Sequence, residues 1–290
     1  MARELLTDRV MKVFLSVLLL SLVALPACQS RGPGDASASS GSARLILTGS
    51  STVAPLAAEI AKRFEAENDG VRIDVQTGGS SRGIADARSG LADIGMASRG
   101  LKTGEQEGLV AHTIARDGIA LIVHSDNSVK ALSDEQVRSI YLGRTTNWRE
   151  VGGPDAEITV VNKASGRATL EVFLAHFGLE ETAIEADVVI GDNEQGVKTV
   201  AGNPHAIGYV SIGTAEFNSQ DGVPIRLLPA GSVEASTANV AKGLFPIGRP
   251  LNLITTGELD ELSKSFIEYA SSSQVHDLVR DLYFVPVSVQ

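Results

Sequence analysis

The sequence predicts an α/β protein built from parallel strands and helices, and two observations support this fold class. Short β-rich runs, such as residues 44–49, 71–78 and 92–96, alternate with segments whose apolar residues recur at helical spacing. Hydrophobic residues make up 43% of the 290 residues, which is enough to bury one large core or two lobes. No segment after residue 42 has the length and composition of a membrane span.

The N-terminal residues 1–27 are predicted to be a signal peptide. Arg3, Arg9 and Lys12 precede an uncharged run at residues 13–25, which is short for a membrane span but typical of a secretory signal. We therefore exclude this segment from the fold and expect the protein to be exported.

Cys28 is the only cysteine of the chain, and the preceding Leu-Pro-Ala is similar to the lipobox of bacterial lipoproteins. Lipidation of Cys28 would anchor the protein to the membrane on its periplasmic or outer side. Residues 28–43 have the glycine and serine content of a flexible tether. Either Met1 or Met11 is the true start, because the segment from Met11 is a signal sequence by itself.

Small hydroxyl residues follow each of the first three predicted strands. In open α/β sheets, ligands bind beyond the carboxyl ends of the strands, so these turns indicate a ligand site. Ordinary helix capping is the alternative for any one of them. The candidate residues in these turns are Ser51, Thr52, Ser80, Ser81, Ser98 and Arg99.

A fourth turn, at residues 164–169, opens a predicted helix with apolar residues at helical spacing between 170 and 177. We expect Ser165 to be the N-cap. Arg167 would add a full positive charge to a helix end that already attracts anions, although an ordinary capped surface helix is the alternative.

Seven segments, in order, resemble the phosphate-binding lipoproteins that deliver phosphate to the phosphate-specific ABC transporter. The resemblance implies a two-lobed periplasmic-binding-protein fold (type II), with mixed sheets flanked by helices and a ligand cleft between the lobes. It places lobe 1 at residues 44–123 and 246–290 and lobe 2 at residues 124–245, with hinges near His124 and Pro246. The matching segments are residues 49–56, 78–84, 91–102, 140–148, 160–173, 206–213 and 245–251.

The resemblance also implies a phosphate site and an ABC transporter permease as partner. Ser98 stands where better-known members have an aspartate that accepts a hydrogen bond from protonated phosphate, and Arg99 adds positive charge beside it. Either Lys163 or Arg167 is the principal cation. Sulfate, molybdate or tungstate are alternative ligands. The implied site residues are Ser51, Thr52, Ser80, Ser81, Lys163, Gly166, Arg167, Ala168 and Thr169.

Other functions have less support in the sequence. Gly79, Ser81 and Gly83 fit the nucleophile elbow of a serine esterase, followed by Asp187 and His205, but too few strands precede Ser81 for that fold. The histidines lack metal-ligand spacing, so neither a metal nor a cofactor is expected. A net charge of -10 without a basic stripe argues against nucleic acid. We expect a monomer without enzymatic activity.

The lipid anchor is testable through its attachment residue. We expect Cys28→Ala to abolish maturation to the lipid-bearing form and to release the protein from the membrane fraction, because no other residue can carry this lipid. Fractionation of cells that express either form measures the change, with globomycin treatment as a parallel block. Unchanged membrane fractionation of Cys28→Ala contradicts the anchor.

Overall fold

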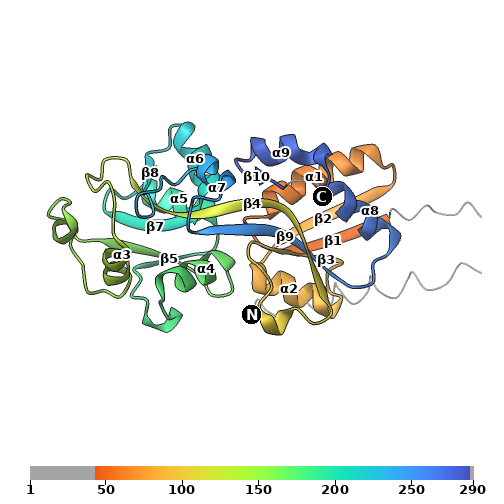
Figure 1. Ribbon diagram of the computed structural model, residues 1–290, viewed down its shortest axis with the longest axis horizontal. Helices are drawn as coiled ribbons and strands as arrows, with labels where there is room; N and C mark the ends of the chain where they lie inside the picture. Colours follow the sequence, from red (N-terminus) through yellow and green to blue (C-terminus); the bar gives the residue numbers. More distant parts are fainter. Residues whose placement is uncertain (1–42, 288–290) are drawn as a thin grey trace, which may run out of the picture. The chain divides into compact units, whose positions relative to one another are not determined.

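A computed structural model describes residues 43–287, in which helices cover a ten-stranded mixed sheet (Figure 1). The predicted α/β class is confirmed. The strand order is β2-β1-β3-β9-β4-β7-β5-β6, and both β8 and β10 pair with β4. The predicted signal peptide, Cys28 and most of the tether lie outside the described residues. Within the described range, no helix has the length and apolar composition needed to cross a membrane.

The first half of the sheet is formed by parallel strands with helical crossovers. β1 (Ala43–Gly49) lies between β2 (Val71–Thr77) and β3 (Ile94–Ala97). The connections are α1 (Ala54–Glu67) and α2 (Ser80–Ser89). The carboxyl ends of all three strands therefore meet at one edge, which brings the hydroxyl turns together.

Two long antiparallel strands cross from this half of the sheet to the other. β4 (Leu109–His124) pairs with β9 (Gly248–Thr256) as far as Gly118, and from Ile119 onward it pairs with β7. The change of partner thus comes before His124, where a hinge was expected from the sequence. The exact limits of the two lobes stay a prediction.

The second half of the sheet repeats the parallel arrangement. β5 (Thr159–Lys163) lies between β6 (Val188–Ile190) and β7 (Ala206–Ser211), while β8 (Ile225–Leu227) runs antiparallel to β4. The other α-helices and the last strand are α3 (Asp134–Tyr141), α4 (Ala168–Phe177), α5 (Asn193–Ala201), α6 (Ile212–Gln220), α7 (Thr237–Ala241), α8 (Glu261–Ala270), α9 (His276–Asp281) and β10 (Val285–Pro286).

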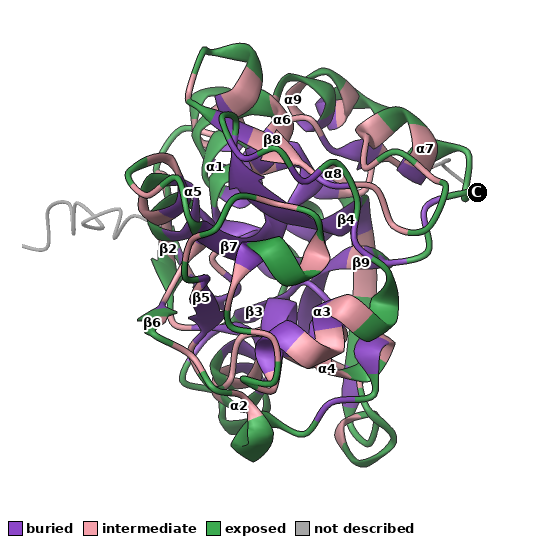
Figure 2. Ribbon diagram, turned by 90° about the vertical axis from the view of Figure 1, so that its left-hand side faces the viewer, coloured by how far each residue is buried: buried purple, intermediate pink, exposed green. Residues whose placement is uncertain are grey.

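Separate apolar clusters stabilise the two halves of the sheet. α1, α8 and α9 pack on the first half through residues such as Leu56 and Phe266. In the second half, the rings of Phe173 and Tyr209 stack with centroids 3.9 Å apart and fix α4 against β7. Buried residues concentrate along β4, β7 and β9, and exposed residues lie on the surrounding helices (Figure 2). The turn that precedes α4 is therefore held on a rigid base.

Gly49 allows the first hydroxyl turn to lie directly against β3. Its φ is +132°, and an added Cβ would lie 2.3 Å from the carbonyl oxygen of Met96. The next residue, Ser50, donates its backbone N–H to that same oxygen at 2.9 Å. A side chain at position 49 would push apart the segments that carry Thr52 and Ser98.

We expect Gly49→Ala to lower the free energy of unfolding by roughly 3 kcal/mol or more, because left-handed backbone strain adds to a clash with immobile backbone. Urea unfolding measures this loss. Gly70→Ala is the matched control: its φ is +78°, but nothing lies within 4 Å of an added Cβ, so only about 1 kcal/mol should be lost. Equal losses in the two variants would show that close packing at Gly49 is unimportant.

Candidate functional site

Buried hydroxyls from four separate segments converge where the two halves of the sheet meet. Thr52 precedes α1, Ser80 opens α2, Ser98 follows β3, and Thr169 lies in the first turn of α4. The first N–H groups of a helix have no partner within that helix, and its N-terminus carries partial positive charge. The segments therefore bring hydrogen-bond donors, rather than carboxylates, to one place.

Arg249 on β9 lies at the centre of these hydroxyls. Its Nη1 donates to Thr169 Oγ1 at 2.9 Å and to Ser98 Oγ at 3.3 Å, and its Nη2 lies 3.4 Å from Thr52 Oγ1. One guanidinium group thus contacts hydroxyls from both halves of the sheet. Arg249, Thr52, Ser98 and Thr169 together are called the Arg249 cluster below.

Asp117 on β4 holds this guanidinium in place. Asp117 and Arg249 are direct partners in the antiparallel β4–β9 ladder, and both side chains are only 1% exposed. Asp117 Oδ2 accepts hydrogen bonds from Arg249 Nε at 3.0 Å and from Nη2 at 2.8 Å. Since a buried guanidinium needs a paired charge to offset its desolvation, Asp117 makes this position tolerable for Arg249. It also leaves Nη1 directed at the hydroxyls.

Lys163 is a second buried cation, and the side chain of Asn193 links it to the Arg249 cluster. Its Nζ donates to the Asp192 carbonyl oxygen at 2.7 Å and to Asn193 Oδ1 at 3.1 Å. Asn193 Nδ2 in turn donates to Thr52 Oγ1 at 3.2 Å. Burial, reinforced by the positive charges of Arg249 and Arg167, lowers the pKa of Lys163 to about 7, against a smaller opposing effect of Asp192.

The turn before α4 differs from the sequence prediction in its cap. The helix begins at Ala168 with Arg167 as the N-cap residue, so the expected Ser165 cap is wrong. Gly166 φ is +76°, and its carbonyl oxygen accepts a hydrogen bond from the Ser81 N–H at 3.3 Å. This backbone contact joins the α2 and α4 turns across the two halves.

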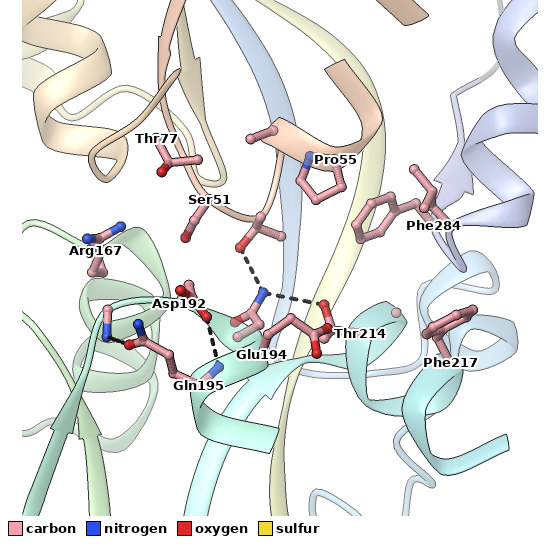
Figure 3. Close-up of a pocket in the computed structure, with 16 residues that line it drawn as sticks. Ser51, Pro55, Thr77, Arg167, Asp192, Glu194, Gln195, Thr214, Phe217 and Phe284 are labelled. Carbon is pink, nitrogen blue, oxygen red and sulfur yellow. Dashed lines mark hydrogen bonds between the residues drawn. The ribbon is translucent and has the colours of Figure 1, made fainter. Parts of the chain in front are cut away.

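Arg167 occupies a different environment from Lys163. Its side chain lines a cavity of about 460 Å³, which is also bordered by Ser51 (Figure 3). Within residues 43–287, no hydrogen bond or ion pair engages the Arg167 guanidinium. Of the two cations proposed from the sequence, Lys163 is thus linked to the Arg249 cluster, whereas Arg167 lies in the cavity wall.

Ser81 and Arg99 belong to a separate group of contacts centred on Glu171 of α4. The Glu171 carboxylate accepts a hydrogen bond from Ser81 Oγ at 2.9 Å and pairs with Arg99 Nε at 2.8 Å and Lys102 Nζ at 2.6 Å. Arg99 also pairs with Glu105 at 2.6 Å. This Glu171 ion-pair group connects α4 to the first half of the sheet, and it engages the charge of Arg99.

The residues of the esterase alternative do not come together. Ser81 faces Glu171 and Arg99, whereas Asp187 accepts a hydrogen bond from the Val160 N–H. His205 is exposed, and its carbonyl oxygen accepts the Trp148 indole N–H. Among the described residues there is also no group of three or more His, Cys, Asp or Glu side chains able to hold a metal ion.

Sequence reasoning missed Arg249, Asp117 and Asn193. Arg249 lies in one of the segments that carried the resemblance, residues 245–251, but it was not proposed as a site residue. A signal was present in the sequence, because a charged residue stands directly before each of two mainly apolar runs. Asp117 precedes residues 118–123, and Arg249 precedes residues 250–254. Charged residues are rarely buried unless they are paired, so two charged residues next to apolar runs indicate a buried ion pair.

Comparison with known proteins identifies the class to which this fold and site belong. Residues 36–274 match the model of the PBP superfamily domain. A Clostridium perfringens protein described as a phosphate ABC transporter substrate-binding protein, solved with bound phosphate, superposes with a TM-score of 0.79 and 34% identity, covering 84% of this chain and all of that one. The two-lobed binding-protein fold is thereby confirmed.

The relatives define the family more closely. The phosphate-binding protein PstS of Bacillus subtilis is 32% identical over 254 residues, which are 85% of this chain and 82% of the relative. An ABC-type phosphate transport receptor from Vibrio cholerae has a TM-score of 0.71 and 29% identity, over 84% of this chain and all of that chain. The chain belongs to the PstS family of substrate-binding proteins.

The depressed pKa of Lys163 predicts how stability depends on pH. Between about pH 7 and pH 10 the unfolded chain keeps the Lys163 proton while the folded chain releases it, so this lysine makes stability rise with pH. Lys163→Met should therefore exceed the wild type in free energy of unfolding near pH 6. The excess should shrink by an amount on the order of 4 kcal/mol as pH rises to 10. Urea unfolding of both ligand-free proteins measures it, and a constant difference contradicts the assignment.

The Glu171 ion-pair group predicts a change in local opening. Glu171→Gln removes the attraction for both Arg99 and Lys102, so hydrogen exchange at the Ser81 amide should accelerate by about tenfold. Asp155→Asn is the matched control, because the Arg149–Asp155 pair is exposed on both sides and should change exchange by less than about twofold. Unchanged exchange at Ser81 in Glu171→Gln would mean that other contacts hold the two halves together.

Proposed function

We propose that this protein binds inorganic phosphate outside the cytoplasmic membrane and delivers it to the permease of an ABC transporter. Membership of the PstS family and likeness to a phosphate-bound structure support this proposal. The single observation that carries it is the Arg249 cluster, where a fixed guanidinium and hydroxyls from both halves of the sheet meet. The direct contacts that we propose are the hydroxyls of Thr52, Ser98 and Thr169, which Arg249 orients while it supplies the positive charge.

The hydrogen-bond arrangement explains why an oxyanion suits this cluster. A hydroxyl has two acceptor positions and one proton to donate. Thr52 Oγ1 already accepts from Arg249 and Asn193, and Ser98 Oγ accepts from Arg249 and Ser50. Each hydroxyl therefore offers its own proton to a ligand. The first amides of α4, at Ala168 and Thr169, add helix N-terminal donors.

The surrounding residues have supporting roles in this proposal. Ser80 Oγ accepts the Ser98 N–H at 3.1 Å and thereby positions Ser98. Lys163 donates to Asn193 Oδ1 and thereby orients Asn193. Gly166 and Ser81 join the two turns by their backbone contact, and Arg99 acts through the Glu171 ion-pair group. Ser51 and Arg167 line the adjacent cavity rather than the cluster.

Discrimination between oxyanions depends on where acceptors lie. The Asp117 carboxylate accepts hydrogen bonds from Arg249 Nε and Nη2 and from the Gly213 N–H, and none of its hydrogen bonds joins it to a hydroxyl of the cluster. No carboxylate therefore takes the place of the family aspartate beside Ser98, and none is positioned to reject sulfate. Sulfate, molybdate and tungstate remain the alternative ligands, and direct titration separates them.

Location and partners complete the proposal. The relatives are substrate-binding proteins of transporters, and we propose the same non-enzymatic role here, with a lipid anchor at Cys28 and a monomeric state. A ligand that contacts both lobes favours the closed form by its greater affinity for that form. The closed form would then be recognised by the permease.

Isothermal titration of the phosphate-stripped protein with phosphate, sulfate, arsenate and molybdate tests this proposal. We expect phosphate to bind with one equivalent, and Arg249→Gln to weaken binding by about a hundredfold or more, because it removes the buried positive charge and the donor that orients the hydroxyls of the cluster. Thr169→Val leaves the Arg249–Asp117 pair intact and should cost about tenfold.

Arg167→Gln is the matched control, because it removes a guanidinium from the cavity wall and not from the cluster. Its affinity loss should stay below about fivefold, which reflects a weak longer-range charge effect. A larger loss in Arg167→Gln than in Arg249→Gln would transfer the principal role to Arg167. Absence of any phosphate binding by the folded wild type would refute the proposed function.

A further inference from the structure

Asn193 is the first residue of α5, and its buried side chain connects the two halves of the sheet. Its Nδ2 donates to Thr52 Oγ1 at 3.2 Å and lies 3.5 Å from Thr214 Oγ1 on α6 (Figure 3). Its Oδ1 accepts from Lys163 Nζ at 3.1 Å and from the Ser211 N–H at 3.4 Å. Three of these four contacts lie within the second half, and the contact with Thr52 reaches the first half.

The donors on one side fix the orientation of this amide. The Lys163 ammonium group has only N–H donors, and the Ser211 backbone presents another, so the amide oxygen must face them. The reverse orientation would direct Nδ2 at two donors and would turn the amide oxygen toward Thr52. The Nδ2 group is therefore the group that meets the Thr52 hydroxyl.

This orientation determines what the Thr52 hydroxyl can do. Thr52 Oγ1 also lies 3.4 Å from Arg249 Nη2, which is a second donor. With a donor at each of its acceptor positions, the hydroxyl has only its proton left to offer, and a bound oxyanion accepts it. An acceptor in place of Asn193 Nδ2 would take this proton, and the Arg249 cluster would lose one of its donors to the ligand.

We infer that Asn193 is a positioning residue for the oxyanion and acts through Thr52 without touching the ligand. The hydrogen bonds run in one direction, from Lys163 to Asn193, from Asn193 to Thr52 and from Thr52 to the ligand, and such chains strengthen their members. The inference rests on the proposed function, since the oxyanion accepts the Thr52 proton. It gives α5, whose first turn lines the adjacent cavity, a part in ligand binding.

Asn193→Asp tests the direction of donation, because it replaces Nδ2 by an oxygen and keeps the acceptor that faces Lys163. The Thr52 proton is then drawn to the new carboxylate. Isothermal titration of the phosphate-stripped protein should show phosphate affinity falling by about tenfold or more, for one lost hydrogen bond and added repulsion. Asn193→Ala removes all four contacts but leaves Thr52 free to donate, so its loss should stay within about threefold.

Two comparisons separate the added charge from the reversed donation. Gln195→Glu is the matched control: it adds a carboxylate to the same turn of α5, keeps the 2.7 Å contact with the Gly191 N–H, and should cost less than about threefold. The second comparison is a double-mutant cycle with Thr52→Val, which has no hydroxyl to redirect. In that background Asn193→Asp should cost no more than about threefold.

The outcomes separate this inference from the proposed function. If the wild type binds phosphate and Asn193→Asp loses equal affinity with and without the Thr52 hydroxyl, the inference is overturned and the proposed function stands. A loss above about tenfold in Asn193→Ala also overturns it, even if Asn193→Asp does not fold, because Asn193 then only holds the two halves together. If the folded wild type binds no phosphate, both proposals fail.

Discussion

The buried ion pair between Arg249 and Asp117 is the interaction on which the site depends. Each side chain alone would be a desolvated, uncompensated charge, and removal of one partner from such a pair typically costs about 3–5 kcal/mol. The antiparallel β4–β9 ladder places the two residues directly opposite each other. Arg249 can therefore remain charged in the interior with its Nη1 group fixed, and the hydroxyls of Thr52, Ser98 and Thr169 are arranged around a donor that has little freedom to move.

This pair lies on the strands that join the two halves of the sheet, which explains how one site draws on both. β4 pairs with β9 up to Gly118 and with β7 from Ile119 onward, so its pairing partner changes directly after Asp117. Thr52 and Ser98 come from the first half and Thr169 from the second, so their contacts with Arg249 depend on how closely the halves approach. The Glu171 ion-pair group involves other side chains of the same turns and adds a second connection between the two halves.

Sequence patterns predicted the first three strands and their hydroxyl turns but not the central cation. The hydroxyl turns after β1, β2 and β3 follow from strands that end in serine and threonine, and parallel pairing brings them together. Arg249 and Asp117 are 132 residues apart and become neighbours through antiparallel crossing strands, which no local pattern encodes. Lys163 and Arg167 lie in one short segment. The sequence does not show that the Lys163 side chain is directed toward the Arg249 cluster and the Arg167 side chain toward the cavity. The Ser165 cap failed because residues 165 and 166 form a turn, with Gly166 φ at +76°, and Arg167 is extended before α4 begins.

A crystal structure of the protein with bound arsenate tests the central claim most directly, because arsenic scatters anomalously and marks the oxyanion without bias from the protein. We expect one strong anomalous peak beside the Arg249 guanidinium, whose positive charge faces the anion. The peak should lie within reach of the hydroxyls of Thr52, Ser98 and Thr169. A peak beside Arg167 or Arg99, with none at Arg249, would contradict the account.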